Sequence, residues 1–270
     1  MTEPSAPRHA GATGIYVYGV VAPDTSAAVF ADAHGVDARQ PVALIVHEGL
    51  AAVTSSVSLD EFGRDALEAN LKDPVWLEEK IRAHDAVLAV AVRRATVVPF
   101  RFGAIYENDD HVREMLAQRR DLVDALSRLA EKLELGVNGY IDRERFRAHV
   151  AAARGTAEEP ESSGRAYMQR RQFERELDTA VSDFAADCAR TVHERLAAVA
   201  DDARLNPLRP ASREGATEML LNGAYLVATG AEDAFRAAVD ELAAHYADDG
   251  VALEVTGPWP PYNFAEEAAA

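Results

Sequence analysis

A chain of 270 residues of which 48% are hydrophobic is long enough to fill one large core or two smaller ones. Its formal net charge of −17 argues against a nucleic-acid binder, because such proteins neutralise phosphates with a basic surface. The lone cysteine, Cys188, excludes an internal disulfide, and the sequence has neither an apolar run of about 18 residues, as a membrane span needs, nor a signal peptide's apolar core. We therefore expect a globular cytoplasmic protein without membrane insertion.

Short strands dominate the beginning of the chain. Residues 1–13 are predicted to be a disordered leader. Aromatic and β-branched residues are dense over residues 14–21, which predicts a buried first strand. Two further strands are predicted at 42–46 and 51–57, with a turn between them, so the segment reads as a hairpin or small meander.

Helical signals follow. A capping box at Ser58 opens a short helix, and Asp73 before a proline opens a second one that reaches about residue 90. A strand that contains a proline is predicted at 96–102, and Asn108 is predicted to cap one long helix as far as residue 134. A last strand at 136–142 then closes a mixed α+β domain that covers residues 14–147.

Residues 148–163 gather Ala, Gly, Glu, Pro and Ser without periodicity, which is typical of a linker. From Gly164 to about residue 203, apolar residues recur every three or four positions, which predicts an unusually long, coiled-coil-like helix. The predicted seam of this helix consists of Phe173, Leu177, Val181, Phe184, Cys188, Val192, Leu196 and Val199. A second domain is therefore expected over residues 164–270.

After the long helix, the pattern indicates a short strand near 205–209, a firm strand at 217–228, a helix to about 246 and a strand from Val251. This order of elements is that of a ferredoxin-like split βαβ unit with a permuted or missing edge strand. The fold class predicted is therefore α+β, with a mixed N-terminal domain and a modified ferredoxin-like C-terminal domain.

No catalytic constellation is visible. None of the eight histidines has a spacing that supplies two metal ligands from one face, and no strand leads into a phosphate-binding glycine loop or a nucleophile elbow. His84 lies beside an apolar run, which favours a hydrogen-bonded interface histidine over a base. Cys188 lies on the seam of the long helix, which favours a buried side chain over a reactive thiol. We expect no cofactor, metal or catalytic residue.

Two arginine-bearing segments are unusual. The positive end of the helix dipole disfavours Arg165, Arg170 and Arg171 in the first turns of the long helix, so glutamates of the linker or an acidic docking partner should compensate them. Arg101 lies between Phe100 and Phe102 in the predicted strand at 96–102. An arginine in this setting usually pairs with a buried carboxylate, and ligand binding is the alternative.

Three blocks in this order resemble the signatures of the GvpL/GvpF family of gas vesicle proteins. They are HDAVL at 84–88 followed by VVPFRFGAIY at 97–106, GRAYMQRR at 164–171, and the terminal TGPWPPYNF at 256–264. The opening IYVYGVV is similar to the family's first strand, and the resemblance covers about 14–264. Val98 and Met168 stand where the family commonly has leucine. The interaction candidates in these blocks are His84, Pro99, Phe100, Arg101, Phe102, Gly103, Gly164, Arg165, Tyr167, Arg170, Arg171, Gly257, Pro258, Trp259, Pro260, Pro261, Tyr262 and Phe264.

The resemblance implies a two-domain α+β protein that is not an enzyme and serves the assembly of gas vesicles in the cytoplasm. Its implied partners are the small hydrophobic shell protein GvpA and other gas vesicle proteins, and the resemblance does not separate the F type from the L type. Trp259 and Tyr262 are expected either to seal a joint between the domains or to face a partner. A competing hypothesis is a small-molecule sensor on a ferredoxin-like domain, which predicts a deep pocket with convergent polar groups.

Overall fold

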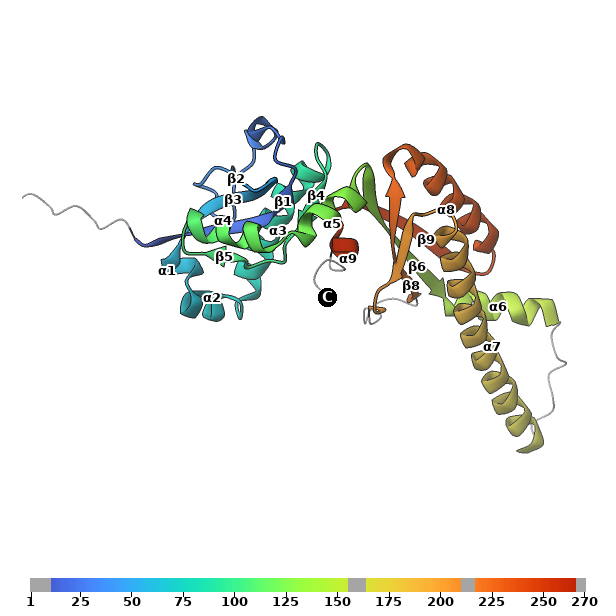
Figure 1. Ribbon diagram of the computed structural model, residues 1–270. Helices are drawn as coiled ribbons and strands as arrows, with labels where there is room; N and C mark the ends of the chain where they lie inside the picture. The colour runs from blue at the N-terminus through green and yellow to red at the C-terminus, as the bar shows by residue number, and fades with distance from the viewer. Residues whose placement is uncertain (1–10, 155–163, 210–216, 266–270) are drawn as a thin grey trace, which may run out of the picture. The chain divides into compact units, whose positions relative to one another are not determined.

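The computed structural model describes residues 11–154, 164–209 and 217–265. The chain divides into two compact units (Figure 1). The first consists of residues 1–131 together with 260–270, and the second of residues 132–259. Both ends of the sequence therefore contribute to the first unit, which the sequence did not reveal.

The first unit is built on an antiparallel sheet of order β2-β3-β1-β4, with β5 also beside β1. Its strands are β1 (Thr13–Val21), β2 (Ala43–His47), β3 (Leu50–Ser58), β4 (Val97–Pro99) and β5 (Ile105–Tyr106). The central strand β1 alternates its buried side chains between the two faces, as its aromatic and β-branched sequence predicts. The predicted first strand and hairpin are confirmed, whereas the strand predicted at 96–102 ends at Pro99.

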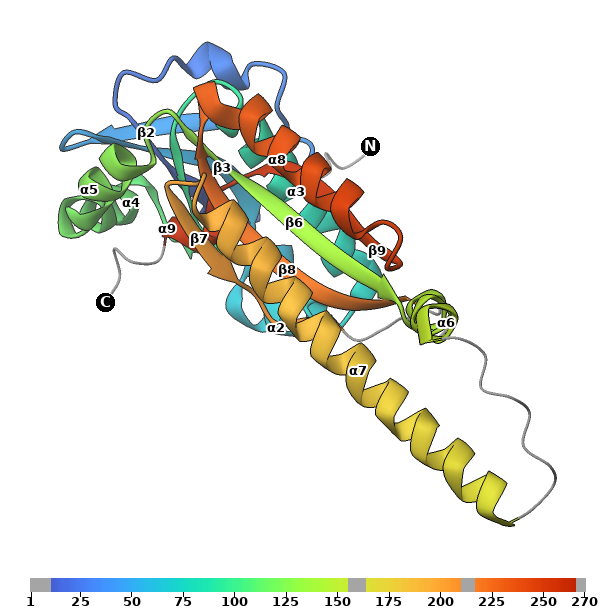
Figure 2. The same ribbon diagram turned by 90° about the vertical axis from the view of Figure 1, so that its right-hand side faces the viewer.

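Helices cover both faces of this sheet (Figure 2). The helices of the unit are α1 (Leu59–Phe62), α2 (Arg64–Asn70), α3 (Pro74–Val92), α4 (Asp109–Gln118), α5 (Asp121–Leu129) and α9 (Tyr262–Ala265), with a short 3-10 helix, η1 (Ala27–Phe30). The long helix α3 packs on the face that carries Tyr16 and Tyr18, and α4 and α5 contact strands on the other face. The predicted caps are confirmed, because the side chains of Asp73 and Asn108 accept hydrogen bonds from the first turns of α3 and α4.

The prediction of one helix from Asn108 to residue 134 is wrong. The backbone leaves the helical region at Arg119, with φ −108 and ψ 59, so α4 ends there and α5 begins at Asp121. The Arg119 side chain makes a two-pronged ion pair with Asp121 across this break, at 2.8–3.0 Å. Glu131 then takes a positive φ of 57, and the chain continues as a strand.

The second unit contains an antiparallel sheet of order β7-β8-β6-β9. Its strands are β6 (Lys132–Asp142), β7 (Asp202–Leu205), β8 (Thr217–Ala228) and β9 (Val251–Trp259), and its helices are α6 (Arg143–Arg154), α7 (Gly164–Ala197) and α8 (Glu232–Tyr246), with a short 3-10 helix, η2 (Thr229–Ala231). The helices α7 and α8 pack on the sheet over a core that includes Leu135, Val137, Tyr225 and Phe235. No helix of the described residues is long and apolar enough to cross a membrane.

The predicted long helix is confirmed over 34 residues, and part of its predicted seam is buried. Leu177, Val181 and Cys188 face the core, whereas Phe173 is 40% exposed. The N-terminal half of α7 extends past the sheet of its unit (Figure 2). The short helix α6 packs beside α7, where Phe146 stacks on Phe184 with ring centroids 4.3 Å apart.

The predicted domain boundaries need correction. The strand at 136–142 was expected to close the first domain, but β6 pairs with β8 over its whole length and with β9 over residues 134–141, so it is central to the second sheet. Residues 148–154 of the predicted linker belong to α6, and 155–163 lie outside the described residues. The predicted leader lies outside them for residues 1–10, and Thr13 is already part of β1. The predicted C-terminal domain loses residues 260–265 to the first unit.

Candidate functional site

Two of the three sequence blocks meet in the first unit. His84 lies in the middle of α3, Phe102 and Gly103 lie in the turn between β4 and β5, and Tyr262 opens the short helix α9. The third block forms the start of α7 in the second unit, where Met168 is 68% exposed and Arg171 is also exposed. The side chains of Arg165, Tyr167 and Arg170 lie outside the described part of the structure, so the predicted compensation of these arginines stays a prediction.

His84 is the centre of the cluster and is 1% exposed. Its Nδ1 lies 2.9 Å from the Tyr16 hydroxyl, and its Nε2 lies 2.9 Å from the Tyr262 hydroxyl. Its ring stacks on Tyr18 and meets Phe102 edge to face, with centroids 5.5 and 6.0 Å away. The predicted hydrogen-bonded histidine is confirmed, and its partners come from β1 and from the last described residues of the chain.

The hydrogen bonds around His84 run in one direction. The Gly103 N–H donates to the Tyr16 oxygen at 3.1 Å, so the Tyr16 hydroxyl is free to donate to Nδ1 of His84. A neutral imidazole that accepts at Nδ1 carries its proton on Nε2, which then donates to the Tyr262 oxygen. The Tyr262 hydroxyl in turn donates to Oδ1 of Asp85 at 3.5 Å. With His84 in the Nε2–H tautomer, the Tyr16 and Tyr262 hydroxyls each donate one hydrogen bond and accept one.

Burial keeps the chain neutral at its tyrosine and histidine members. It lowers the pKa of the His84 imidazole to about 4, against a smaller raising effect of a backbone hydrogen bond at Phe100. It also raises the pKa of Tyr16, Tyr262 and the Asp85 carboxyl. A neutral imidazole between two neutral hydroxyls holds three elements together without a buried charge. The arrangement is therefore suited to fastening the chain end.

We call residues 260–265 the C-terminal strap. Pro260, Pro261 and Phe264 are buried, and Phe264 is 1% exposed. The carbonyl of Phe264 accepts a hydrogen bond from Nη2 of Arg128 in α5 at 2.8 Å. The strap is therefore held by a hydrogen bond to His84 of α3, by a hydrogen bond to Arg128 of α5 and by the buried side chain of Phe264.

The residues before the strap belong to β9 of the second unit. Gly257 has a positive φ of 106, and the bond to Pro258 is cis. Trp259 is 48% exposed, and its Nε1 donates to Oγ1 of Thr256 at 3.0 Å. Trp259 and Tyr262, which the sequence placed together as one aromatic tail, therefore belong to different units.

A groove of about 360 Å³ runs along the VVPFRFGA segment, and we call it the strap groove. It is lined by Val98, Pro99, Phe100, Arg101, Phe102, Gly103, Ala104, Arg119, Leu122 and Ala265. Ala265 of the strap is part of this lining. Arg101 is exposed and lies beyond the end of β4, so it is not a strand residue as predicted, and its pairing with a carboxylate stays a prediction.

A larger groove of about 600 Å³ lies between the helices α1 and α2 and strand β5, and we call it the helix groove. Much of its lining is apolar, and Leu71 at the end of α2 is 43% exposed. The rim carries Arg64, Glu68 and Glu107. Gly103 lines both the helix groove and the strap groove.

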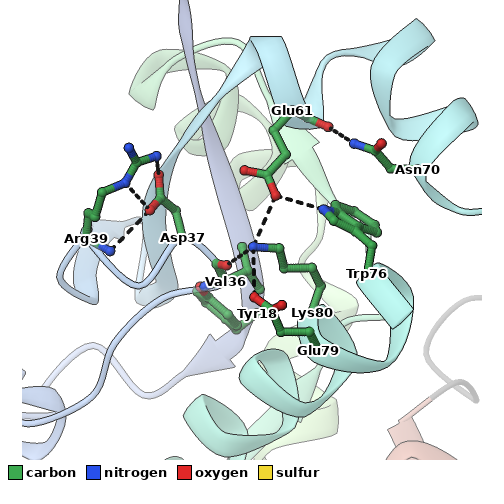
Figure 3. A network of polar contacts seen from close by, with 9 residues as sticks. All are labelled: Tyr18, Val36, Asp37, Arg39, Glu61, Asn70, Trp76, Glu79 and Lys80. Atoms are coloured by element: carbon green, nitrogen blue, oxygen red, sulfur yellow. Dashed lines mark hydrogen bonds and ion pairs between the residues drawn. The ribbon is translucent and has the colours of Figure 1, made fainter. Parts of the chain in front are cut away.

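A buried lysine, which the sequence did not single out, joins α3 to α1 and to the segment that carries Val36 (Figure 3). Lys80 of α3 is 9% exposed, and its Nζ donates to the carbonyl of Val36 at 3.2 Å and pairs with Oε1 of Glu61 at 3.1 Å. The same carboxylate oxygen accepts from Nε1 of Trp76 at 2.8 Å. Glu78, Glu79 and Arg82 surround Lys80 in the sequence, so no local signal sets it apart from a solvated lysine.

Cys188 behaves as the sequence predicts. The side chain is 2% exposed in the core of the second unit, and burial raises the pKa of the thiol to about 12. The described residues contain no group of three His, Cys, Asp or Glu side chains that could hold a metal ion.

The fold and the site define a two-unit α+β protein whose C-terminal strap returns to the first unit. The chain belongs to the GvpL/GvpF family, because the model of this family, described as "Gas vesicle synthesis protein GvpL/GvpF", matches residues 14–266. This membership supports a role in gas vesicle formation.

Relatives and a solved structure agree with this family. The chain is 34% identical over 257 residues to gas vesicle protein L of Streptomyces sp. (strain CB03234), covering 93% of this chain and 92% of the relative. It is 33% identical over 236 residues to gas vesicle protein F of the same strain, covering 85% and 90%. The crystal structure of GvpF from Anabaena sp. PCC7120 has the same fold, with a TM-score of 0.68, 19% identity and coverage of 94% and 96%.

Proposed function

We propose that this protein is a non-enzymatic accessory or minor structural component of gas vesicle assembly. It acts in the cytoplasm, where it binds other gas vesicle proteins and, in particular, the hydrophobic shell protein GvpA. The observation that carries the proposal is the family match over residues 14–266. Similarity to relatives of both the L and the F type supports the role for the family as a whole.

The second unit supports the modified ferredoxin-like fold that we propose for it. Its main elements follow one another as strand, helix, strand, strand, helix, strand, if α6 and α7 together count as the first crossover. The strand that was missing from the sequence-based order is β6, which lies between β8 and β9. Such a fold does not determine an activity, so the function is argued from surfaces.

The helix groove is the surface that we propose for the shell protein. A small apolar subunit needs a partner that covers apolar surface, and a strongly charged partner keeps the complex soluble. Leu59, Leu67 and Ile105 supply apolar lining to the helix groove, and Leu71 extends it to the exposed surface. The net charge of −17 supplies the solubility.

A pull-down with purified shell protein tests the proposal, with the other vesicle proteins assayed in parallel. Wild-type protein should retain the shell protein, and Leu71→Asp should weaken retention by about tenfold or more, since it places a charge in the apolar groove. Val75→Asp is the matched control, because Val75 is 74% exposed, lies in the first turn of α3 and does not line the helix groove. If wild-type protein retains no vesicle protein, the proposed function is refuted.

A further inference from the structure

The first unit is discontinuous in sequence, and its last piece is the strap. Residues 132–259 stand between the body of the unit and residues 260–265. The strap is held on that body by the Tyr262 hydroxyl at His84 and by the Phe264 carbonyl at Arg128. These two contacts join residues 178 and 136 positions apart in the sequence.

The hydrogen-bond chain connects the strap to the wall of both grooves. From Tyr262 it passes through His84 to the Tyr16 hydroxyl, which accepts from the N–H of Gly103. Gly103 has a positive φ of 93, which glycine adopts at little cost. The backbone turn that shapes the lining of the two grooves is therefore held by a hydroxyl whose orientation depends on His84.

A second contact joins the strap to the same surface directly. Among the strap residues, Ala265 at the end of α9 is the one that lines the strap groove. The strap also contacts β4, whose last residues, Val98 and Pro99, line this groove. The strap thus contributes to the groove once through its own side chain and once through the orientation of Gly103.

We propose that the C-terminal strap is a latch that sets the geometry of the two grooves and thereby controls partner binding at the first unit. Docking of Tyr262 on His84 orients Tyr16, Tyr16 holds the Gly103 turn, and Ala265 completes the strap groove. The effect on the partner rests on the proposed function, whereas the coupling between strap and turn does not. The latch is a conformational device, since no atom of the strap needs to touch the partner in the helix groove.

Amide hydrogen exchange in the full-length protein tests the coupling, with Tyr262→Phe as the perturbation. This variant removes the hydroxyl that contacts His84 and Asp85 and keeps the ring, so the protein should fold. Loss of about one hydrogen bond predicts about a tenfold faster exchange at the Gly103 amide, with no change in the β2–β3 hairpin. Arg128→Gln loosens the other end of the strap and should shift the Gly103 amide in the same direction.

The matched control is Tyr246→Phe, which removes a tyrosine hydroxyl that bonds Thr191 in the second unit and should leave Gly103 unchanged. Unchanged exchange at Gly103 in both strap variants overturns the latch, whatever the partner is. A second measurement compares the affinity for the shell protein, which Tyr262→Phe should lower several-fold and Tyr246→Phe should not. If Tyr262→Phe speeds exchange at Gly103 but leaves the affinity for the shell protein unchanged, the strap does not control binding. The proposed function still stands in that case, provided that wild-type protein retains the shell protein.

Discussion

The burial of His84 predicts that the protein loses stability on mild acidification. The ordinary pKa of histidine is 6.5, and the folded environment lowers it to about 4. Because the unfolded chain takes up the proton first, the His84 contribution is fully present above about pH 6.5 and is lost as the pH falls toward 4. At about pH 5.5 the loss in the free energy of unfolding is about 1.4 kcal/mol, and below pH 4 it reaches about 3 kcal/mol.

Urea unfolding followed by circular dichroism between about pH 5.5 and 7.5 measures this loss above the pI of about 4.9. The reference is His84→Gln, which does not titrate at this position and keeps a donor and an acceptor. The reference is necessary because burial also raises the pKa of Asp85, and a carboxyl with a raised folded pKa gains stability on acidification. Subtracting the curve of the variant from that of wild-type protein leaves the contribution of His84.

The difference between the two curves should fall by about 1.4 kcal/mol from pH 7.5 to 5.5. A difference that does not change by more than the roughly 10–15% uncertainty of the extrapolated free energies would refute the assignment of a buried neutral imidazole. A difference that rises on acidification would mean that the folded state stabilises the imidazolium. In that case Nδ1 of the imidazolium would donate to the Tyr16 oxygen, which reverses the direction of that hydrogen bond.

Three further outcomes are expected. Lys80→Met should lower the free energy of unfolding by about 2 kcal/mol, because the Glu61 side chain is 31% exposed and stays partly solvated without its partner. A double-mutant cycle with Glu61→Gln, measured by urea unfolding, should show a coupling energy above about 0.5 kcal/mol. Phe264→Ala should cost about 2–4 kcal/mol in thermal unfolding, whereas Phe173→Ala, at a 40% exposed position, should cost less than about 1; equal costs would contradict the buried strap. The Cys188 thiol, whose pKa is about 12, should resist alkylation until urea unfolds the second unit, and rapid labelling of folded protein would contradict its burial.

Local signals predicted much of the secondary structure. The side chains of Asp73 and Asn108 cap helices because their oxygens satisfy the first free N–H groups, and this chemistry depends only on nearby residues. The apolar period of α7 likewise marks its length, since a helix repeats every 3.6 residues wherever it packs. Elements whose cause lies within a few residues could therefore be recognised from the sequence.

The partition into units could not be predicted in the same way. The apolar residues Leu126, Leu129 and Leu133 continue a helical spacing across the end of α5, although Leu133 is already in β6. The change is made by the positive φ of Glu131, a conformation that the sequence pattern does not mark for a residue other than glycine. Alternation identifies a strand at 136–142 but carries no information on which sheet it joins, because pairing is decided by residues 217–228 and 251–259.

The site shows the same division. His84 could be predicted as a hydrogen-bonded histidine from its apolar neighbours on α3, but its partners Tyr16 and Tyr262 lie 68 and 178 positions away. A single sequence contains no signal that joins such positions. The clamp at Lys80 escaped notice for a related reason, because a lone lysine on a helix is normally solvated and only the Val36 loop, 44 positions away, buries it.

The placement of the strap changes how the closing sequence TGPWPPYNF should be understood. Its first half ends β9 and belongs to the second unit, while its second half completes the first unit at His84 and Arg128. The last strand of the first unit ends at residue 106, but the unit is complete only with residues that follow Trp259 in the sequence. A fragment that ends before the strap lacks the Tyr262 hydroxyl that contacts Nε2 of His84, and the latch predicts that this loss reaches the Gly103 turn through His84 and Tyr16. Effects of C-terminal changes on partner binding should accordingly be sought in the first unit as well as near the chain end.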